Sequence, residues 1–170
     1  MRLLRTLERV TDAAAVIGVI LIIPLILAMV YEVMSRYLFS APTFWAYELG
    51  YMMMGAIFML GMAHALKVRQ HVTVDVLHGN LPPRGKALVN VIGYCFFIPC
   101  VAWLTWGLWG YLVRAYVSGE GTGQSAWNPQ IWPYRVVLVV GFAVFLLQVL
   151  IEFAKNLQAL FASDATDSRS

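Results

Sequence analysis

Three histidines are the residues whose chemistry would be most distinctive, because imidazole is a common ligand of haem iron and other metals. A haem held by two histidines in a helix bundle needs one ligand on each of two facing helices within the membrane. His64 lies inside an apolar stretch, about one helical turn from its end, whereas His71 and His78 fall in the polar segment that follows. The spacing therefore favours interfacial histidines over ligands, and it predicts neither a cofactor nor a metal site.

Other signatures of catalysis are missing from the sequence. No nucleophile with a neighbouring base can be read from the spacing, and the chain has neither a glycine-rich phosphate loop nor a Cys-x-x-Cys pair. Cys95 and Cys100 share one apolar stretch and would stand about 140° apart on a helix, so they cannot form a disulfide with each other. We therefore predict that the chain is not an enzyme.

A few polar side chains lie inside or beside the apolar stretches, where each is costly in lipid and is a functional candidate by default. Glu32 and Arg36 stand at i and i+4 with the acid first, the favourable order for a helical pair, so they form either a structural salt bridge or a contact with a partner chain. Gln148 could hydrogen-bond within the bundle or across to a partner. The candidates for an interface or structural role are Glu32, Arg36, Trp45, Glu48 and Gln148.

Loss of an ion-pair partner in a partly buried setting costs more than loss of one hydrogen bond in a membrane. We therefore expect Arg36→Ala to impair assembly more than Gln148→Leu. Glu152 and Lys155 read as an ordinary interfacial pair.

The elements that carry these residues are long apolar segments. Of the 170 residues, 61% are hydrophobic and 12% are charged, whereas a soluble domain is about a quarter charged. The charges are absent from four stretches, each long enough to cross a hydrocarbon core of about 30 Å. The pattern predicts an all-α integral membrane protein with four transmembrane helices, at about 13–36, 46–66, 87–113 and 133–153.

Basic residues predict the orientation of these helices. The N-terminal segment, the second loop and the C-terminal segment together hold nine of the twelve lysines and arginines, and the first and third loops hold three. The positive-inside bias therefore predicts that both termini are cytoplasmic. Tryptophans fit an interfacial belt at the outer ends of the spans: Trp45, Trp103, Trp106, Trp109, Trp127 and Trp132. The net charge of +3 is explained by this bias rather than by nucleic-acid binding.

The connections are short, and residues 1–163 form a single membrane domain without internal repeats. Asp75 can cap a helix that Pro82 stops, so we expect a short interfacial helix between the second and third spans. The glycine-rich loop at residues 118–125 reads as flexible. The segment 164–170 reads as a polar tail without regular structure. The first apolar run is longer than that of a signal peptide and lacks a cleavage motif, which favours an uncleaved first helix.

Solute carriers bind their ions and solutes near the middle of the membrane, usually between paired broken helices. This sequence has no paired broken helices, no internal symmetry and almost no polarity in the middle of its spans. We therefore expect that the chain does not transport a solute alone.

The motifs along the chain resemble those of the DctQ-like family, the small membrane subunits of tripartite ATP-independent periplasmic (TRAP) transporters. The resemblance covers nearly the whole chain, and its most specific part is the loop motif with His71, Asp75, Pro82, Pro83 and Arg84. The other matching motifs are Glu32-x-x-x-Arg36-Tyr37, Pro42-x-x-Trp45-x-x-Glu48, Pro129-x-x-Trp132-Pro133 and Leu147-Gln148.

The resemblance implies a multi-pass protein of a prokaryotic inner membrane, acting as a non-catalytic scaffold in a sodium-coupled secondary transporter. Its partners would be a large multi-helix permease subunit, which carries the sodium sites and the solute path, and an extracytoplasmic solute-binding protein. Membrane lipids would surround it, and the solute would be an organic acid or a related small molecule. Two alternatives stay open: a membrane anchor of an electron-transfer complex, and an unrelated assembly protein.

Overall fold

The computed structural model describes residues 2–68 and 83–167. This part of the chain forms four helices and no β-strand: α1 (Arg2–Leu38), α2 (Ala46–Lys67), α4 (Pro83–Ser118) and α5 (Trp132–Asp167). All four are long and apolar enough to cross a membrane. The all-α fold with four transmembrane helices is confirmed. The expected interfacial helix falls within residues 69–82, outside the described residues, and the orientation of the helices stays a prediction.

Three helices extend beyond the apolar spans expected from the sequence. α1 begins at Arg2 instead of near residue 13, and α4 covers 83–118 instead of 87–113. α5 continues to Asp167, so residues 164–167 are helical and the prediction of an irregular tail over them is wrong. Hydropathy marks where a helix leaves the lipid. The helix itself can continue into water where its residues favour helix and its side chains pack against another helix.

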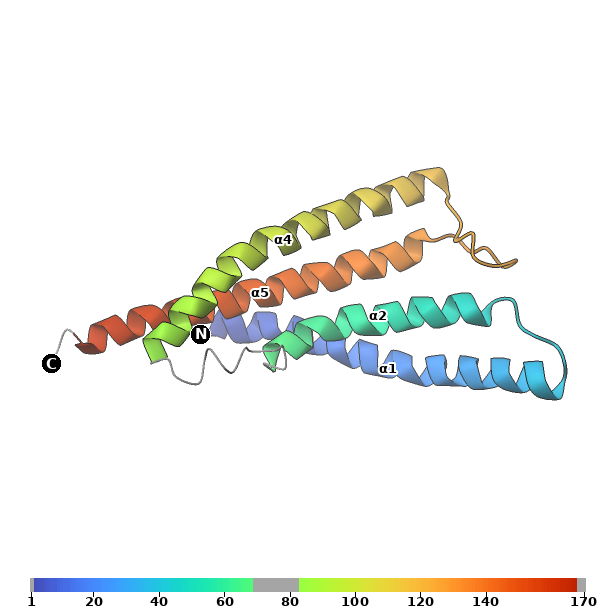
Figure 1. The fold of residues 1–170 in the computed structure, drawn as a ribbon, viewed down its shortest axis with the longest axis horizontal. Coiled ribbons are helices and arrows are strands. Elements are labelled where there is room, and N and C mark those ends of the chain that lie inside the picture. The colour runs from blue at the N-terminus through green and yellow to red at the C-terminus, as the bar shows by residue number, and fades with distance from the viewer. Residues whose placement is uncertain (1, 69–82, 168–170) are drawn as a thin grey trace.

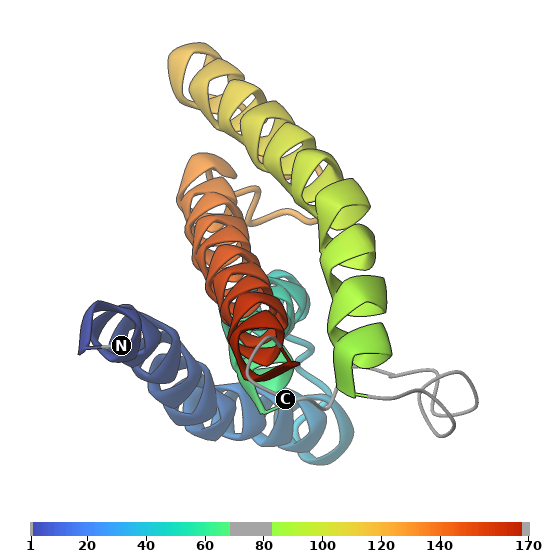
Figure 2. The same ribbon diagram turned by 90° about the vertical axis from the view of Figure 1, so that its left-hand side faces the viewer.

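The helices lie in the order α4, α5, α2, α1 across the molecule, with α4 and α1 on opposite sides (Figure 1). α5 packs against all three other helices, and α1 also packs along α2. Arg2 and Asp167, the first residue of α1 and the last of α5, lie at the same end of the bundle, which we call the terminal end (Figure 1). The opposite end, where α1 connects to α2 and α4 to α5, is the hairpin end. α4 bends along its length, and Pro99 lies inside it (Figure 2).

Glycines allow α2 and α5 to approach each other closely. A Cβ on Gly55 of α2 would collide with the ring of Tyr134 on α5. A Cβ on Gly141 of α5 would lie 2.8 Å from the Cβ of Met59. Small residues of this kind permit close packing where no water drives helices together.

The connection between α4 and α5 is folded, although its glycine content predicted flexibility. Thr122 donates its backbone N–H to the carbonyl of Pro129, and Ile131 donates to Glu120, both at 3.0 Å. Gly119 and Gly123 adopt positive φ values of 62° and 65°, which glycine accepts without strain. The loop is therefore a short hairpin, and the expectation of a flexible segment is wrong for these residues.

A buried apolar cluster joins three of the helices. It contains Val101 of α4, Ala63 and Leu66 of α2, and Phe145 and Val149 of α5. Because α5 packs against both α4 and α2, its side chains lie at the centre of this cluster.

The structure places two of the tryptophans of the expected belt away from the end of their helix. Trp103 is the central residue of the apolar segment Leu88–Ser118 of α4, and Trp106 lies three residues beyond it. The two residues therefore do not lie at the outer end of this segment, where the sequence predicted them.

Candidate functional site

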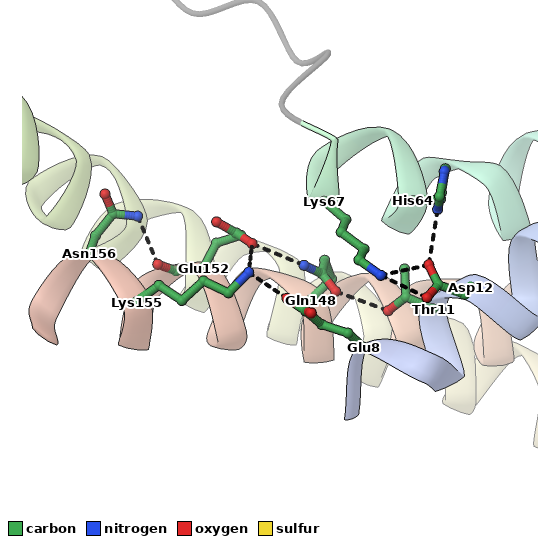
Figure 3. A network of polar contacts seen from close by, with 9 residues as sticks. All are labelled: Glu8, Thr11, Asp12, His64, Lys67, Gln148, Glu152, Lys155 and Asn156. Carbon is green, nitrogen blue, oxygen red and sulfur yellow. Dashed lines mark hydrogen bonds and ion pairs between the residues drawn. The ribbon is translucent and has the colours of Figure 1, made fainter. Parts of the chain in front are cut away.

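Buried polar side chains join α1 to α5 near the terminal end (Figure 3). The hydroxyl of Thr11 donates a 3.0 Å hydrogen bond to Oε1 of Gln148, and Nε2 of Gln148 donates at 3.2 Å to Glu152. Thr11 and Gln148 are 0% exposed and Glu152 is 4% exposed. Gln148 therefore binds within this chain, which answers the question that the sequence left open.

Lys155 continues this network toward the terminal end. Its ammonium group lies 2.7 Å from Glu152, one turn back on α5, and pairs with Glu8 of α1. The expected pair of Glu152 and Lys155 is thus confirmed, and Glu8 joins it from the opposite end of the sequence. One cation between two carboxylates offsets part of the cost of burying these acids.

A second group joins α1 to α2 at the same level. Lys67 lies 2.7 Å from both carboxylate oxygens of Asp12, and Nδ1 of His64 lies 3.4 Å from the same carboxylate (Figure 3). The Asp12 side chain is 46% exposed, so this pair faces the surface. His64 lies beside an acid, and within the described chain no group of three His, Cys, Asp or Glu residues could hold a metal ion.

Asparagines attach α4 to the same end of the bundle. The Asn90 amide donates a 3.0 Å hydrogen bond to Oδ1 of Asn156, and Asn156 donates at 2.7 Å to the carbonyl of Glu152. All four helices are therefore joined by polar contacts at the terminal end, while apolar side chains fill the span above it. We call Glu8, Thr11, Asp12, His64, Lys67, Asn90, Gln148, Glu152, Lys155 and Asn156 the terminal network.

At the hairpin end, Glu32 organises the connection from α1 to α2. Nε of Arg36 donates to its carboxylate at 2.9 Å, and the backbone N–H of Thr43 donates to the other oxygen at 2.9 Å. The Thr43 hydroxyl binds the same oxygen. The structural salt bridge of Glu32 and Arg36 is therefore present. The Arg36 side chain is 55% exposed while that of Glu32 is 10% exposed, so Arg36 keeps an open side.

Trp45 and Glu48 both belong to the start of α2. The Trp45 ring stacks on Tyr31 of α1, with centroids 5.9 Å apart. Glu48 is 0% exposed, and neither carboxylate oxygen has a hydrogen-bond partner among the described residues. The carboxylate stands in the first turn of α2, where the helix dipole favours negative charge.

The residues of the loop motif lie mostly outside the described part of the chain. His71, Asp75 and Pro82 fall within residues 69–82, so their predicted roles stay predictions. Pro83 is the first residue of α4, a position that tolerates proline because no helical N–H is needed there. Arg84 follows it in the first turn of α4.

Sequence reasoning named Gln148, Glu152 and Lys155 but missed their partners on α1. Thr11 and Asp12 come three and four residues after Glu8 and therefore lie on the same side of the helix as Glu8. This polar face directly before an apolar run was the available signal. It could not identify the facing helix, because Thr11 and Gln148 are 137 residues apart in the sequence.

The chain was compared with known proteins and protein families. The family model for the DctQ component of tripartite ATP-independent periplasmic transporters matches residues 25–159. The match runs from the middle of α1 to the last turns of α5 and includes Glu32, Glu48 and Gln148. No curated protein matches the chain.

Proposed function

The chain belongs to the DctQ family, the small membrane components of TRAP transporters, and from this premise we propose that it is a non-catalytic scaffold that holds the large permease subunit. The observation that carries the proposal is which groups bind the buried polar side chains. Thr11, Glu32, Gln148 and Glu152 are all bound by side chains or backbone of this chain. Glu48, which has no partner among the described residues, lies in the first turn of α2 at the hairpin end. The bound groups hold helices together and leave no polar cradle in the middle of the described spans.

Sodium coupling and solute binding would then belong to the large permease subunit. A sodium site needs several oxygen ligands, and a carboxylate solute needs hydrogen-bond donors or a cation within the membrane. The acids and cations of the described helices lie near the two ends and mostly bind each other. We propose that the complex transports an organic acid delivered by an extracytoplasmic solute-binding protein, and that this chain supplies no ligand to it.

The same proposal places the chain in the inner membrane of a prokaryote with both termini in the cytoplasm. The terminal network would then lie at the cytoplasmic boundary of the lipid, and the hairpin end would face the solute-binding protein. Nine of the twelve basic residues support this orientation.

Co-purification and uptake test the proposed function. The tagged chain, expressed with its large permease subunit, is expected to retain that subunit through detergent purification. Proteoliposomes holding both subunits and the solute-binding protein are expected to take up solute under a sodium gradient, whereas those holding this chain alone should match empty vesicles. Saturable uptake by the chain alone would contradict the scaffold role.

A further inference from the structure

α4 is the helix that the bundle covers least. Only 6% of its apolar window is buried, against 39% in α5. It packs on α5 through the face that holds Val101 (2% exposed) and Ala115 (0% exposed). The opposite face therefore meets whatever surrounds the protein in the membrane.

That opposite face has an unusual composition for a lipid-facing surface. At 100° per residue, its residues fall within about 100° of arc around the helix. Phe96 is 76% exposed, and Trp103 and Trp106 are each 77% exposed. We define the α4 face by Phe96, Trp103, Trp106, Gly107 and Gly110.

The two indoles carry hydrogen-bond donors that lipid tails cannot satisfy. Trp103 and Trp106 lie near the middle of the apolar segment Leu88–Ser118 of α4, and no acceptor in the described chain binds either N–H. A polar group without a partner in hydrocarbon is costly, and buried tryptophans usually find one. An acceptor on another protein segment in the membrane would satisfy these donors.

The glycines of the α4 face also favour contact with another helix. Gly55 and Gly141 are explained by close neighbours within the bundle, whereas a Cβ on Gly107 or Gly110 would meet nothing within 4 Å. Glycine weakens a helix relative to alanine, so an unneeded glycine has a cost. A backbone that approaches α4 from outside would use the space, as small residues do at membrane helix interfaces.

The exposed face of α1 shows what a lipid-facing surface of this chain looks like. Val19, Ile23 and Leu27 are each more than half exposed and purely aliphatic. A second copy of the chain is a poor match for the α4 face, because two such faces would each offer indole donors and no side-chain acceptor. The occupant must differ in composition and present acceptors.

We propose that the α4 face binds a transmembrane helix of the large permease subunit, one that offers hydroxyl or carbonyl acceptors to Trp103 and Trp106. The inference rests on the proposed function, which supplies the partner, and goes beyond it by naming the surface. α4 then stands between the partner and the rest of the bundle.

Site-specific photo-crosslinking in the intact complex tests this surface. Benzoylphenylalanine replaces Trp103 in one variant and Ile23 in another, since Ile23 is 63% exposed and is the central residue of the apolar segment Glu8–Leu38, as Trp103 is of Leu88–Ser118. The expected result is an adduct with the large subunit from position 103 and only lipid adducts from position 23. Lipid adducts alone from position 103, a dimer of this chain, or equal adducts from both positions would overturn the inference.

Retention of the large subunit by the unsubstituted chain separates the two proposals. If the large subunit co-purifies but crosslinks only from other faces, the α4 face is wrong and the scaffold role stands. If it does not co-purify, the proposed function fails and the inference fails with it.

Side-chain size at Gly107 gives a second measurement. Gly107→Ala and Gly107→Leu should both fold, because the position is open within the chain. Recovery of the large subunit should be close to normal with alanine and fall about tenfold with leucine, as one steric conflict at a packed interface predicts. Equal recovery with both variants at matched thermal stability would overturn the proposed close approach.

Discussion

The hydroxyl of Thr11 on α1 donates a 3.0 Å hydrogen bond to Oε1 of Gln148 on α5, and both side chains are fully buried. The two residues are 137 positions apart, so this bond joins the first and last helices of the chain. It lies at the level where the apolar core of the bundle gives way to the ion pairs of the terminal network. Neutral polar groups thus set the register of α1 on α5, with charged groups beyond them.

Removal of this bond should be measurable. Gln148→Leu is expected to lower the free energy of unfolding by about 1–2 kcal/mol, because it leaves the buried Thr11 hydroxyl without an acceptor. Thr11→Val should cost a similar amount, and the double variant should cost less than the sum of the two. Unfolding in mixed micelles with increasing SDS gives the three values. Strict additivity would show that the two side chains do not interact.

Arg36→Ala should lower the free energy of unfolding less than Gln148→Leu does. The order expected from the sequence concerns assembly with a partner and stays a prediction. The Arg36 side chain is 55% exposed, and Glu32 keeps two bonds to Thr43 without it. An exposed pair of this kind contributes about 0–1 kcal/mol. The same unfolding assay compares the two variants, and recovery of the large subunit is measured beside it. Normal stability with lost recovery would indicate that Arg36 contacts the partner.

The two lysines of the terminal network should differ in their contribution to stability. Lys155→Met leaves Glu152, whose side chain is 5% exposed, without its cation, and should cost about 1–3 kcal/mol. Lys67→Met leaves Asp12, which is 46% exposed and can be hydrated, so it should cost less than about 1 kcal/mol. The matched pair removes one charge each from the terminal network. Equal losses in thermal midpoint would contradict the role of burial.

The sequence predicted the helices better than their contacts. Apolar runs identify four spans because lipid permits only backbone that satisfies its own hydrogen bonds. The same runs could not show that α1 begins at Arg2, since α1 continues past the lipid boundary alongside α5. They also placed Trp103 too near the outer end of its span, because α4 continues to Ser118 and Trp103 is the centre of the apolar segment Leu88–Ser118.

The candidate site residues also differ in whether their contacts could be predicted from the sequence. Glu32 and Arg36 were readable because both lie on one helix, one turn apart. The contacts from Thr43 to Glu32 and from Glu8 to Lys155 depend on loop geometry or on packing between distant segments. Local spacing carries no information about either.

The orientation predicts which end is open to reagents added outside the cell. With Cys95 and Cys100 replaced by serine, a cysteine at Ser118 should react with a membrane-impermeant maleimide in whole cells. A cysteine at Gly85 should react only after the cells are opened. These two positions lie at opposite ends of α4, so they report on one helix. Reaction of Gly85→Cys in intact cells would show that the termini are outside.

Replacement of Glu48 should leave the fold intact and should show whether its buried carboxylate stabilises or destabilises the bundle. Its carboxylate is 0% exposed and has no hydrogen-bond partner in the described chain, so it destabilises the isolated bundle unless the dipole of α2 offsets the burial. We expect Glu48→Leu to raise the free energy of unfolding by about 1 kcal/mol, which corresponds to about 2–4 °C in thermal midpoint for a chain of this size. Glu48→Gln keeps the shape and should change the midpoint less. If the leucine variant is instead less stable, the carboxylate stabilises the first turn of α2, and its burial is part of how that helix starts.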